Sequence, residues 1–280
     1  MIQREPEKLK GQIRSFSLRH NLQPQEVLQM YMFERVLERL SKSQYANSFI
    51  LKGGLLISSM VGIEERTTMD MDTTVTGINM EEDDIQRIIT EVLSLEVEDG
   101  IRFEFIKIEP IREDDDYSNF RVSFIAHYGK IANEMKIDIT TGDVITPSAV
   151  RYHYRTILDG ELIPIRAYNL ETIIAEKYET IIRRNIGTTR ARDFYDLHMV
   201  YNLYKNEIDY TVLKYAVYRT SKKRSSEDLL MEWNDICSEM RGDQGLKKLW
   251  QNYCDNNSFS RGASYDAVLN TVSEIGRKIS

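Results

Sequence analysis

The hydrophobic positions change their period along the chain, from mixed helix and strand patterns to an uninterrupted helical pattern. Apolar residues recur at helical spacing between residues 9 and 40, which predicts two helices. Alternation with period two predicts strands at about 67–75, 101–109, 119–128 and 131–140, and a helix at about 83–95 lies between the first two. From Leu170 onward the pattern predicts only helices, at 170–186, 192–204 and in amphipathic segments to Ile279.

These elements predict an α+β fold, in which helices flank a mixed or antiparallel sheet and a C-terminal helical bundle follows. We expect two parts, residues 1–165 and 166–280. They should pack against each other, because 5 Pro and 14 Gly leave no Pro-rich or Gly/Ser-rich linker between them. The apolar run 49–51 leads into Lys52-Gly53-Gly54, which we expect to form a turn that opens a short buried helix.

Composition excludes several classes of protein. A chain of 280 residues with 41% hydrophobic and 29% charged residues can bury a large core, so it is neither disordered nor a disulfide scaffold. Cys237 and Cys254 have no metal-ligand spacing around them, which argues against a zinc site and favours a reducing cytoplasm. The N-terminus lacks a signal-like apolar segment and no long apolar run occurs, so we expect neither secretion nor membrane spanning.

Charge is distributed unevenly. The net charge of −7 argues against bulk coating of nucleic acid, yet residues 166–224 contain 12 Lys and Arg against 7 Asp and Glu. If RNA binds, we expect its backbone on this basic stretch, including the patch at 219–224, although a solubilising surface is the alternative. Two acidic runs, 81–84 and 113–116, are interpreted as solvated charges.

Candidate chemistry begins with Asp70 and Asp72 on the predicted strand at 67–75. Carboxylates two residues apart project from one face, about 7 Å apart along the strand, and suit one or two divalent cations. An acidic face of an exposed edge strand is the alternative. Asp138 points away from the apolar side of its own strand and is a candidate third carboxylate, with Lys136 on the same face.

Three further segments carry residues that suit a ligand-binding site. Gly53 and Gly54 allow close approach of the backbone to a ligand, and the helix start that follows favours a phosphate. Lys177 interrupts an apolar helical stripe, so it must either reach solvent or meet an anion. Asp193 and Asp196 share a helix face, where support of the helix start is the alternative to a site.

Together these segments resemble the AbiEii/AbiGii-type toxins of phage abortive-infection and type IV toxin–antitoxin systems, which have a nucleotidyltransferase-like fold. The resemblance covers about residues 25–205, and four separated motifs occur in the family's order. They are Lys52-Gly53-Gly54, the segment 66–72 with Asp70 and Asp72, Lys136-Ile137-Asp138, and Lys177 followed by Arg192 to Asp196. The wider nucleotidyltransferase superfamily has Gly-Ser before the paired aspartates, and this chain has Gly53-Gly54, the form associated with the toxin family.

The resemblance implies roles for these residues. Asp70, Asp72 and Asp138 would bind Mg²⁺ or Mn²⁺, and Asp138 would also activate the attacking hydroxyl. Lys177 would contact the triphosphate. The helical part of the chain would supply Lys177 to the site, together with Asp193 and Asp196. Asp196 would orient the nucleotide or hold Lys177. Nucleotide-binding roles fall to the remaining motif residues, which are Lys52, Gly53, Gly54, Lys136 and Arg192.

The resemblance also implies a reaction and partners. A nucleotide would pass from an NTP to an acceptor, RNA such as a tRNA 3′ end, and cause growth arrest in antiviral defence. A co-encoded antitoxin would restrain the toxin without requiring a stable complex. Two alternatives stay open. Glu134 and Lys136 with Asp70 could form a metal-dependent nuclease site, or the chain could be a non-catalytic nucleotide-binding regulatory module.

Overall fold

The computed structural model of the chain describes residues 5–111 and 119–280. The chain forms two compact units. The sheet unit comprises Met1–Asp143 and Val150–Ala167, and the helical unit comprises Val144–Ala149 and Tyr168–Ser280. The acidic run at 113–116 lies outside the described residues. Within the part of the chain that is described, no helix is both long and apolar enough to cross a membrane.

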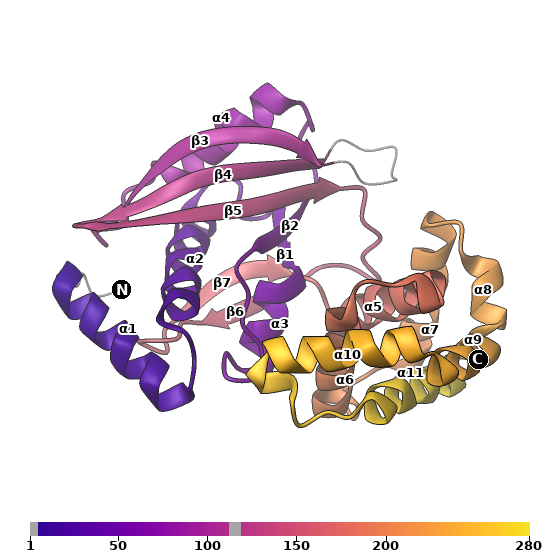
Figure 1. Cartoon of the computed structure of the whole chain (residues 1–280). Coiled ribbons are helices and arrows are strands. Elements are labelled where there is room, and N and C mark those ends of the chain that lie inside the picture. The colour runs from indigo at the N-terminus through magenta and orange to yellow at the C-terminus, as the bar shows by residue number, and fades with distance from the viewer. Residues whose placement is uncertain (1–4, 112–118) are drawn as a thin grey trace. The chain divides into compact units, whose positions relative to one another are not determined.

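Seven strands of the sheet unit, as far as it is described, form one mixed sheet in the order β3-β4-β5-β2-β1-β7-β6 (Figure 1). Two neighbouring pairs, β2 with β5 and β1 with β7, are parallel, and the other pairs are antiparallel. The strands are β1 (Phe49–Lys52), β2 (Met71–Val75), β3 (Arg102–Ile111), β4 (Asn119–Tyr128), β5 (Ile131–Thr141), β6 (Val150–Arg155) and β7 (Leu162–Ala167).

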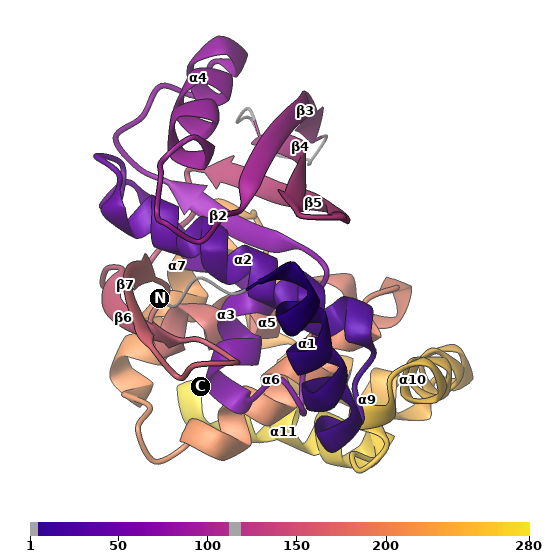
Figure 2. The same cartoon turned by 90° about the vertical axis from the view of Figure 1, so that its left-hand side faces the viewer.

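Helices cover one face of this sheet and leave part of the other open. Buried residues alternate along β4 and β5 with residues that are more exposed, which is the pattern of strands with a single covered face. Helix α4 contacts β3, and α2 contacts both α4 and β7 (Figure 2). The helices of this unit are α1 (Pro6–His20), α2 (Pro24–Lys42), α3 (Gly53–Val61) and α4 (Glu82–Leu93).

The helical unit is built around α5, whose apolar residues are buried against its neighbours. Helix α5 contacts α6, α7, α8 and α9, and α11 contacts α6, α7 and α9. Asn169 caps α5 by accepting a hydrogen bond from the Thr172 amide, as short polar residues at N-caps do. The helices are α5 (Leu170–Arg184), α6 (Ala191–Tyr204), α7 (Tyr210–Lys223), α8 (Glu227–Met231), α9 (Trp233–Gly242), α10 (Gln244–Asn256) and α11 (Tyr265–Ile279).

The structure confirms the predicted α+β class and corrects several boundaries. The segment 49–51 is a strand, β1, because it pairs on both sides with β2 and β7. Strands β6 and β7 lie where the sequence pattern indicated none. The strand predicted at 67–75 begins only at Met71, since the Thr68 hydroxyl bonds to the backbone of Asp70 and holds a turn there. Asp70 therefore lies immediately before the strand.

Candidate active site

The junction of β1 and α3 is a tight turn that only glycine can form. Gly53 has a φ of +65°, and a β-carbon on it would lie 2.0 Å from Oδ2 of Asp72. A β-carbon on Gly54 would lie 2.8 Å from Oγ1 of Thr68. The backbone amide of Gly54 donates a hydrogen bond of 3.4 Å to Oδ2 of Asp72. The two glycines thus bring the Asp72 carboxylate against the N-terminus of α3, where anions are favoured.

Four charged residues form a row across adjacent strands of the sheet unit. Lys52 of β1 pairs with Asp72 of β2, and Asp72 pairs with Asp138 of β5. Asp138 in turn pairs with Arg121 of β4. Residues at paired positions on neighbouring strands project from the same face, so the row reads Lys, Asp, Asp, Arg across the sheet. Asp72 and Asp138, which the sequence predicts in one site, occupy directly paired positions in the parallel register of β2 with β5.

Arg121 binds Asp138 with two hydrogen bonds. Its Nε and one terminal nitrogen each lie 2.7 Å from a different oxygen of the carboxylate, the two-pronged geometry that arginine offers to carboxylates. These bonds raise the pKa of the Arg121 guanidinium, and the charges of Asp138, Asp70 and Asp72 add to the rise. The charges of three carboxylates therefore stabilise the protonated guanidinium of Arg121. Sequence reasoning missed Arg121, because only the register of β4 with β5 reveals its partner.

Lys52 is held by a carboxylate that the sequence did not single out. Its Nζ lies 2.6 Å from Oδ2 of Asp143, which follows β5 and also accepts a hydrogen bond of 2.7 Å from the Thr140 hydroxyl. Burial raises the pKa of the Asp143 carboxyl, but the charge of Lys52 and hydrogen bonds from Lys52, Thr74 and Thr140 outweigh it and lower the pKa to about 2. The ammonium group of Lys52, the first residue of the charged row, is thus fixed in position.

We expect Asp143→Asn to lower the free energy of unfolding by about 2 kcal/mol at neutral pH. The folded-state pKa lies below the unfolded value of 3.8, so this stabilisation is present above about pH 4 and is lost as the pH falls toward 2. Urea unfolding at a series of pH values measures it, with exposed Asp83→Asn as the control. A difference between wild type and Asp143→Asn that does not shrink below pH 4 would contradict the assigned ion pair.

The donor set suits a divalent cation, although the carboxylates do not form a cluster in this arrangement. Among residues 5–111 and 119–280, no group of three or more His, Cys, Asp or Glu side chains is placed to hold a metal ion. Both Asp138 oxygens accept hydrogen bonds from Arg121. Carboxylate oxygens on adjacent strands are still the ligands that Mg²⁺ and Mn²⁺ prefer. The metal-binding role of Asp70, Asp72 and Asp138 stays a prediction.

Lys177 of the helical unit meets anions rather than solvent. Its Nζ lies 2.6 Å from Oδ1 of Asp193 and 2.9 Å from Oδ2 of Asp196. Oδ2 of Asp193 lies 2.8 Å from Nε of Arg190. Burial lowers the pKa of the Lys177 ammonium, but the two aspartate charges outweigh burial and raise the pKa. Asp193 and Asp196 are both buried, and they are the counter-ions of Lys177.

Two other predicted residues are exposed. Lys136 lies on β5 two residues before Asp138, on the same open face of the sheet, as its spacing predicts. Arg192 lies in the first turn of α6, and no hydrogen bond or ion pair involves it within the helical unit as described. Their predicted roles in nucleotide binding stay predictions.

A family model described as nucleotidyl transferase AbiEii toxin, type IV TA system, matches residues 35–271. The chain belongs to the AbiEii family. This confirms the resemblance inferred from the motifs and extends it over most of the helical unit. Membership favours a transferase over the nuclease alternative. It also implies an NTP as substrate and an antitoxin as partner.

Among solved structures, those similar to this AbiEii chain include JHP933 from Helicobacter pylori, with a TM-score of 0.48 and 17% identity over 90% of this chain and 93% of that one. A nucleotidyltransferase-like antigenic protein from Paracoccidioides brasiliensis has a TM-score of 0.43 and 13% identity over 77% and 93%. ANT(2″)-Ia in complex with adenylyl-2″-tobramycin has a TM-score of 0.41 and 16% identity over 69% and 98%. No curated protein matches the chain.

Proposed function

We propose that this chain transfers a nucleotide from an NTP to an RNA acceptor, with a tRNA 3′ end as the preferred acceptor class. The observation that supports the proposal most is the register that sets Asp72 beside Asp138, with Asp72 held at the Gly53-Gly54 turn. In the cytoplasm, such transfer would inactivate RNA needed for translation. Growth arrest of an infected cell would follow, as expected of an abortive-infection toxin.

The sheet unit offers defined groups for each part of the reaction. The amides at the start of α3 and the ammonium group of Lys52 would bind phosphate oxygens of the NTP. Asp70, Asp72 and Asp138 would hold Mg²⁺ or Mn²⁺, which when bound stabilises charge on the transferring phosphate.

In the proposed step the acceptor hydroxyl attacks the α-phosphorus of the NTP. The acceptor hydroxyl oxygen forms a bond to the α-phosphorus, the bond from that phosphorus to the β-phosphate bridging oxygen breaks, and pyrophosphate leaves. Asp138 would accept the hydroxyl proton, which requires one of its oxygens to be released by Arg121. Arg121 would then be available to bind a phosphate oxygen, since its guanidinium is always charged.

A surface of the helical unit supports RNA as the acceptor class. Helix α7 contains no Asp or Glu, and Lys214, Tyr215, Tyr218 and Lys222 are exposed along it. Tyr215 and Tyr218 are 57% and 48% exposed, and the Arg219 guanidinium lies 5.6 Å from the centre of the Tyr215 ring. Positive charge interleaved with aromatic rings is the chemistry that tracks a nucleic-acid backbone and stacks its bases.

The experiment that tests this function incubates the purified protein with total tRNA and each labelled NTP, and separates the RNA on a denaturing gel. We expect label in RNA with one NTP, and no label when EDTA replaces Mg²⁺ and Mn²⁺. Shortened RNA would establish the nuclease alternative. Label in another macromolecule, with none in RNA, would overturn the proposed acceptor.

A further inference from the structure

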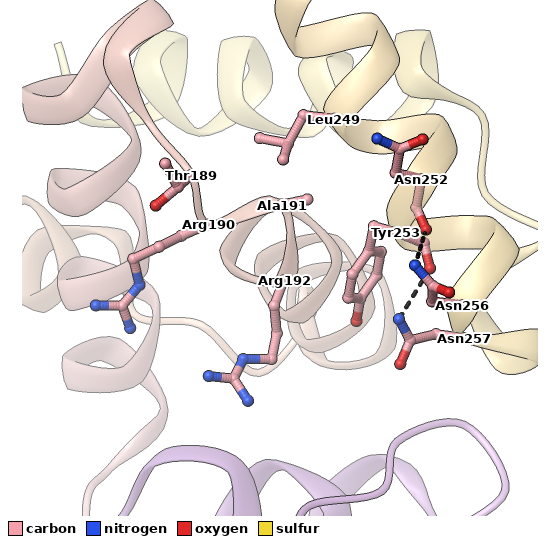
Figure 3. A pocket seen from close by; sticks show the side chains of 9 residues that line it. All are labelled: Thr189, Arg190, Ala191, Arg192, Leu249, Asn252, Tyr253, Asn256 and Asn257. Atoms are coloured by element: carbon pink, nitrogen blue, oxygen red, sulfur yellow. Dashed lines mark hydrogen bonds between the residues drawn. The ribbon is translucent and has the colours of Figure 1, made fainter.

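A cavity of about 330 Å³ lies in the helical unit between the start of α6 and the C-terminal half of α10 (Figure 3). Its polar lining includes Arg190, Arg192, Asn252, Tyr253, Asn256 and Asn257. Its size falls in the range of sites that hold one small molecule or one nucleotide. All of these residues belong to the helical unit, so the cavity is a feature of that unit alone.

The cavity suits an anion that brings no metal with it. Both charged residues of the lining are arginines, and no carboxylate lines it. Arg190 also binds Asp193, whereas Arg192 has no ion pair within the helical unit as described. Sites for a metal-bound triphosphate usually supply one or two carboxylate ligands to its cation, and no carboxylate lines this cavity. A phosphodiester requires only donors and positive charge, which the two arginines supply.

The opposite wall of the cavity presents a fixed aromatic ring and oriented amides. The Tyr253 ring packs against Tyr195, with ring centres 6.0 Å apart, and against Trp250 at 5.8 Å. Asn256 donates a hydrogen bond of 2.9 Å to the carbonyl of Asn252, and Asn257 donates one of 2.8 Å to the carbonyl of Tyr253. These bonds fix both carboxamides in orientation. Proteins recognise an unstacked base with an aromatic ring, on which the base stacks, and with amide groups, which bind the edge of the base.

We propose that this cavity binds a single unpaired nucleotide of the RNA acceptor. A phosphodiester group lies against Arg192, with Arg190 beside it, and the base lies against Tyr253. The oriented carboxamide of Asn256 reads the edge of the base. This inference rests on the proposed function and names the part of the chain that recognises its acceptor. Because Arg190 also contacts Asp193, the cavity adjoins the cluster that holds Lys177.

The test measures RNA binding by the full chain without catalysis. A fluorescein-labelled single-stranded RNA of about twelve nucleotides ending in CCA is titrated by anisotropy in EDTA without NTP, at several salt concentrations. We expect Arg192→Gln to weaken binding about tenfold and to lower the slope of log affinity against log salt by about one, because one phosphate contact is lost. Asn256→Ala should weaken binding without changing that slope. Both residues are exposed, so neither variant threatens folding.

Arg184→Gln is the matched control, since Arg184 is exposed in the same unit and lies outside the cavity lining. Binding of MgATP should be equal in Asn256→Ala, Arg184→Gln and the wild type. Two results for Arg192→Gln would overturn the cavity assignment: an RNA affinity and salt slope equal to those of the wild type, or a loss of MgATP binding in place of RNA binding. Either result would leave transfer to RNA by the wild type untouched. Failure of the wild type to label any RNA would remove the proposed function, and this assignment with it.

Discussion

Asp72→Asn is expected to reduce nucleotide incorporation by about 10²–10³-fold. The substitution keeps the size of the side chain and an oxygen that can accept the hydrogen bond from the Gly54 amide. It removes the negative charge that stands between Lys52 and Asp138 in the strand register. The loss of activity should therefore come from the missing charge and not from a disturbed turn. Incorporation of labelled nucleotide into RNA, measured at saturating metal, is the assay.

Asp83→Asn serves as the control for this prediction, because Asp83 is an exposed aspartate in the same unit. It should keep full activity. Both variants should have a free energy of unfolding within about 1 kcal/mol of the wild type, which separates a chemical effect from a folding effect. Retained incorporation in Asp72→Asn would show that the charged row is not the site of transfer.

Lys177→Met is expected to destabilise the helical unit by about 3–5 kcal/mol. The Lys177 ammonium is the shared partner of Asp193 and Asp196, and its removal leaves two buried carboxylates with Arg190 bound to only one of them. Breaking a buried ion pair from one side is costly, because the remaining charge keeps its desolvation penalty. Thermal or urea unfolding followed by circular dichroism measures the effect.

A second substitution tests whether the effect is electrostatic. In Lys177→Met/Asp196→Asn one of the two buried carboxylates that lose the Lys177 ammonium is neutral, so the double variant should be more stable than Lys177→Met by at least about 1 kcal/mol. Lys247→Met, at an exposed lysine of α10, should leave stability within about 0.5 kcal/mol of the wild type. If the double variant is no more stable than Lys177→Met, the buried ion pair is not the source of the loss.

The sequence predicted the α+β class and most long helices and strands, because amphipathic periods of ten or more residues are strong local patterns. It missed β1, since three buried apolar residues before a helix have no period of their own. It missed β7, which contains Pro164, a residue that argues against a strand. Pro164 is tolerated because β1 pairs with β7 only at Arg166 and Ala167, beyond the proline.

The candidate site was predictable as a set of residue types and not as a set of contacts. Asp72 and Asp138 are separated by 65 intervening residues, and only the parallel register of β2 with β5 makes them neighbours. The partners Arg121 and Asp143 follow from that same register and from the segment after β5, neither of which leaves a local pattern. Lys177 was the exception, because a lysine within an apolar stripe must either reach solvent or meet an anion, and the structure shows the second outcome.

The most direct test of nucleotidyl transfer follows the two ends of the triphosphate separately. The wild-type protein is incubated with RNA and the active NTP, labelled in one reaction at the α-phosphate and in another at the γ-phosphate. Transfer of a nucleotide predicts that the α-label enters the RNA and that the γ-label is released in pyrophosphate. A γ-label in the RNA would show phosphate transfer instead, and RNA shortened without either label would show a nuclease; each result would contradict the account.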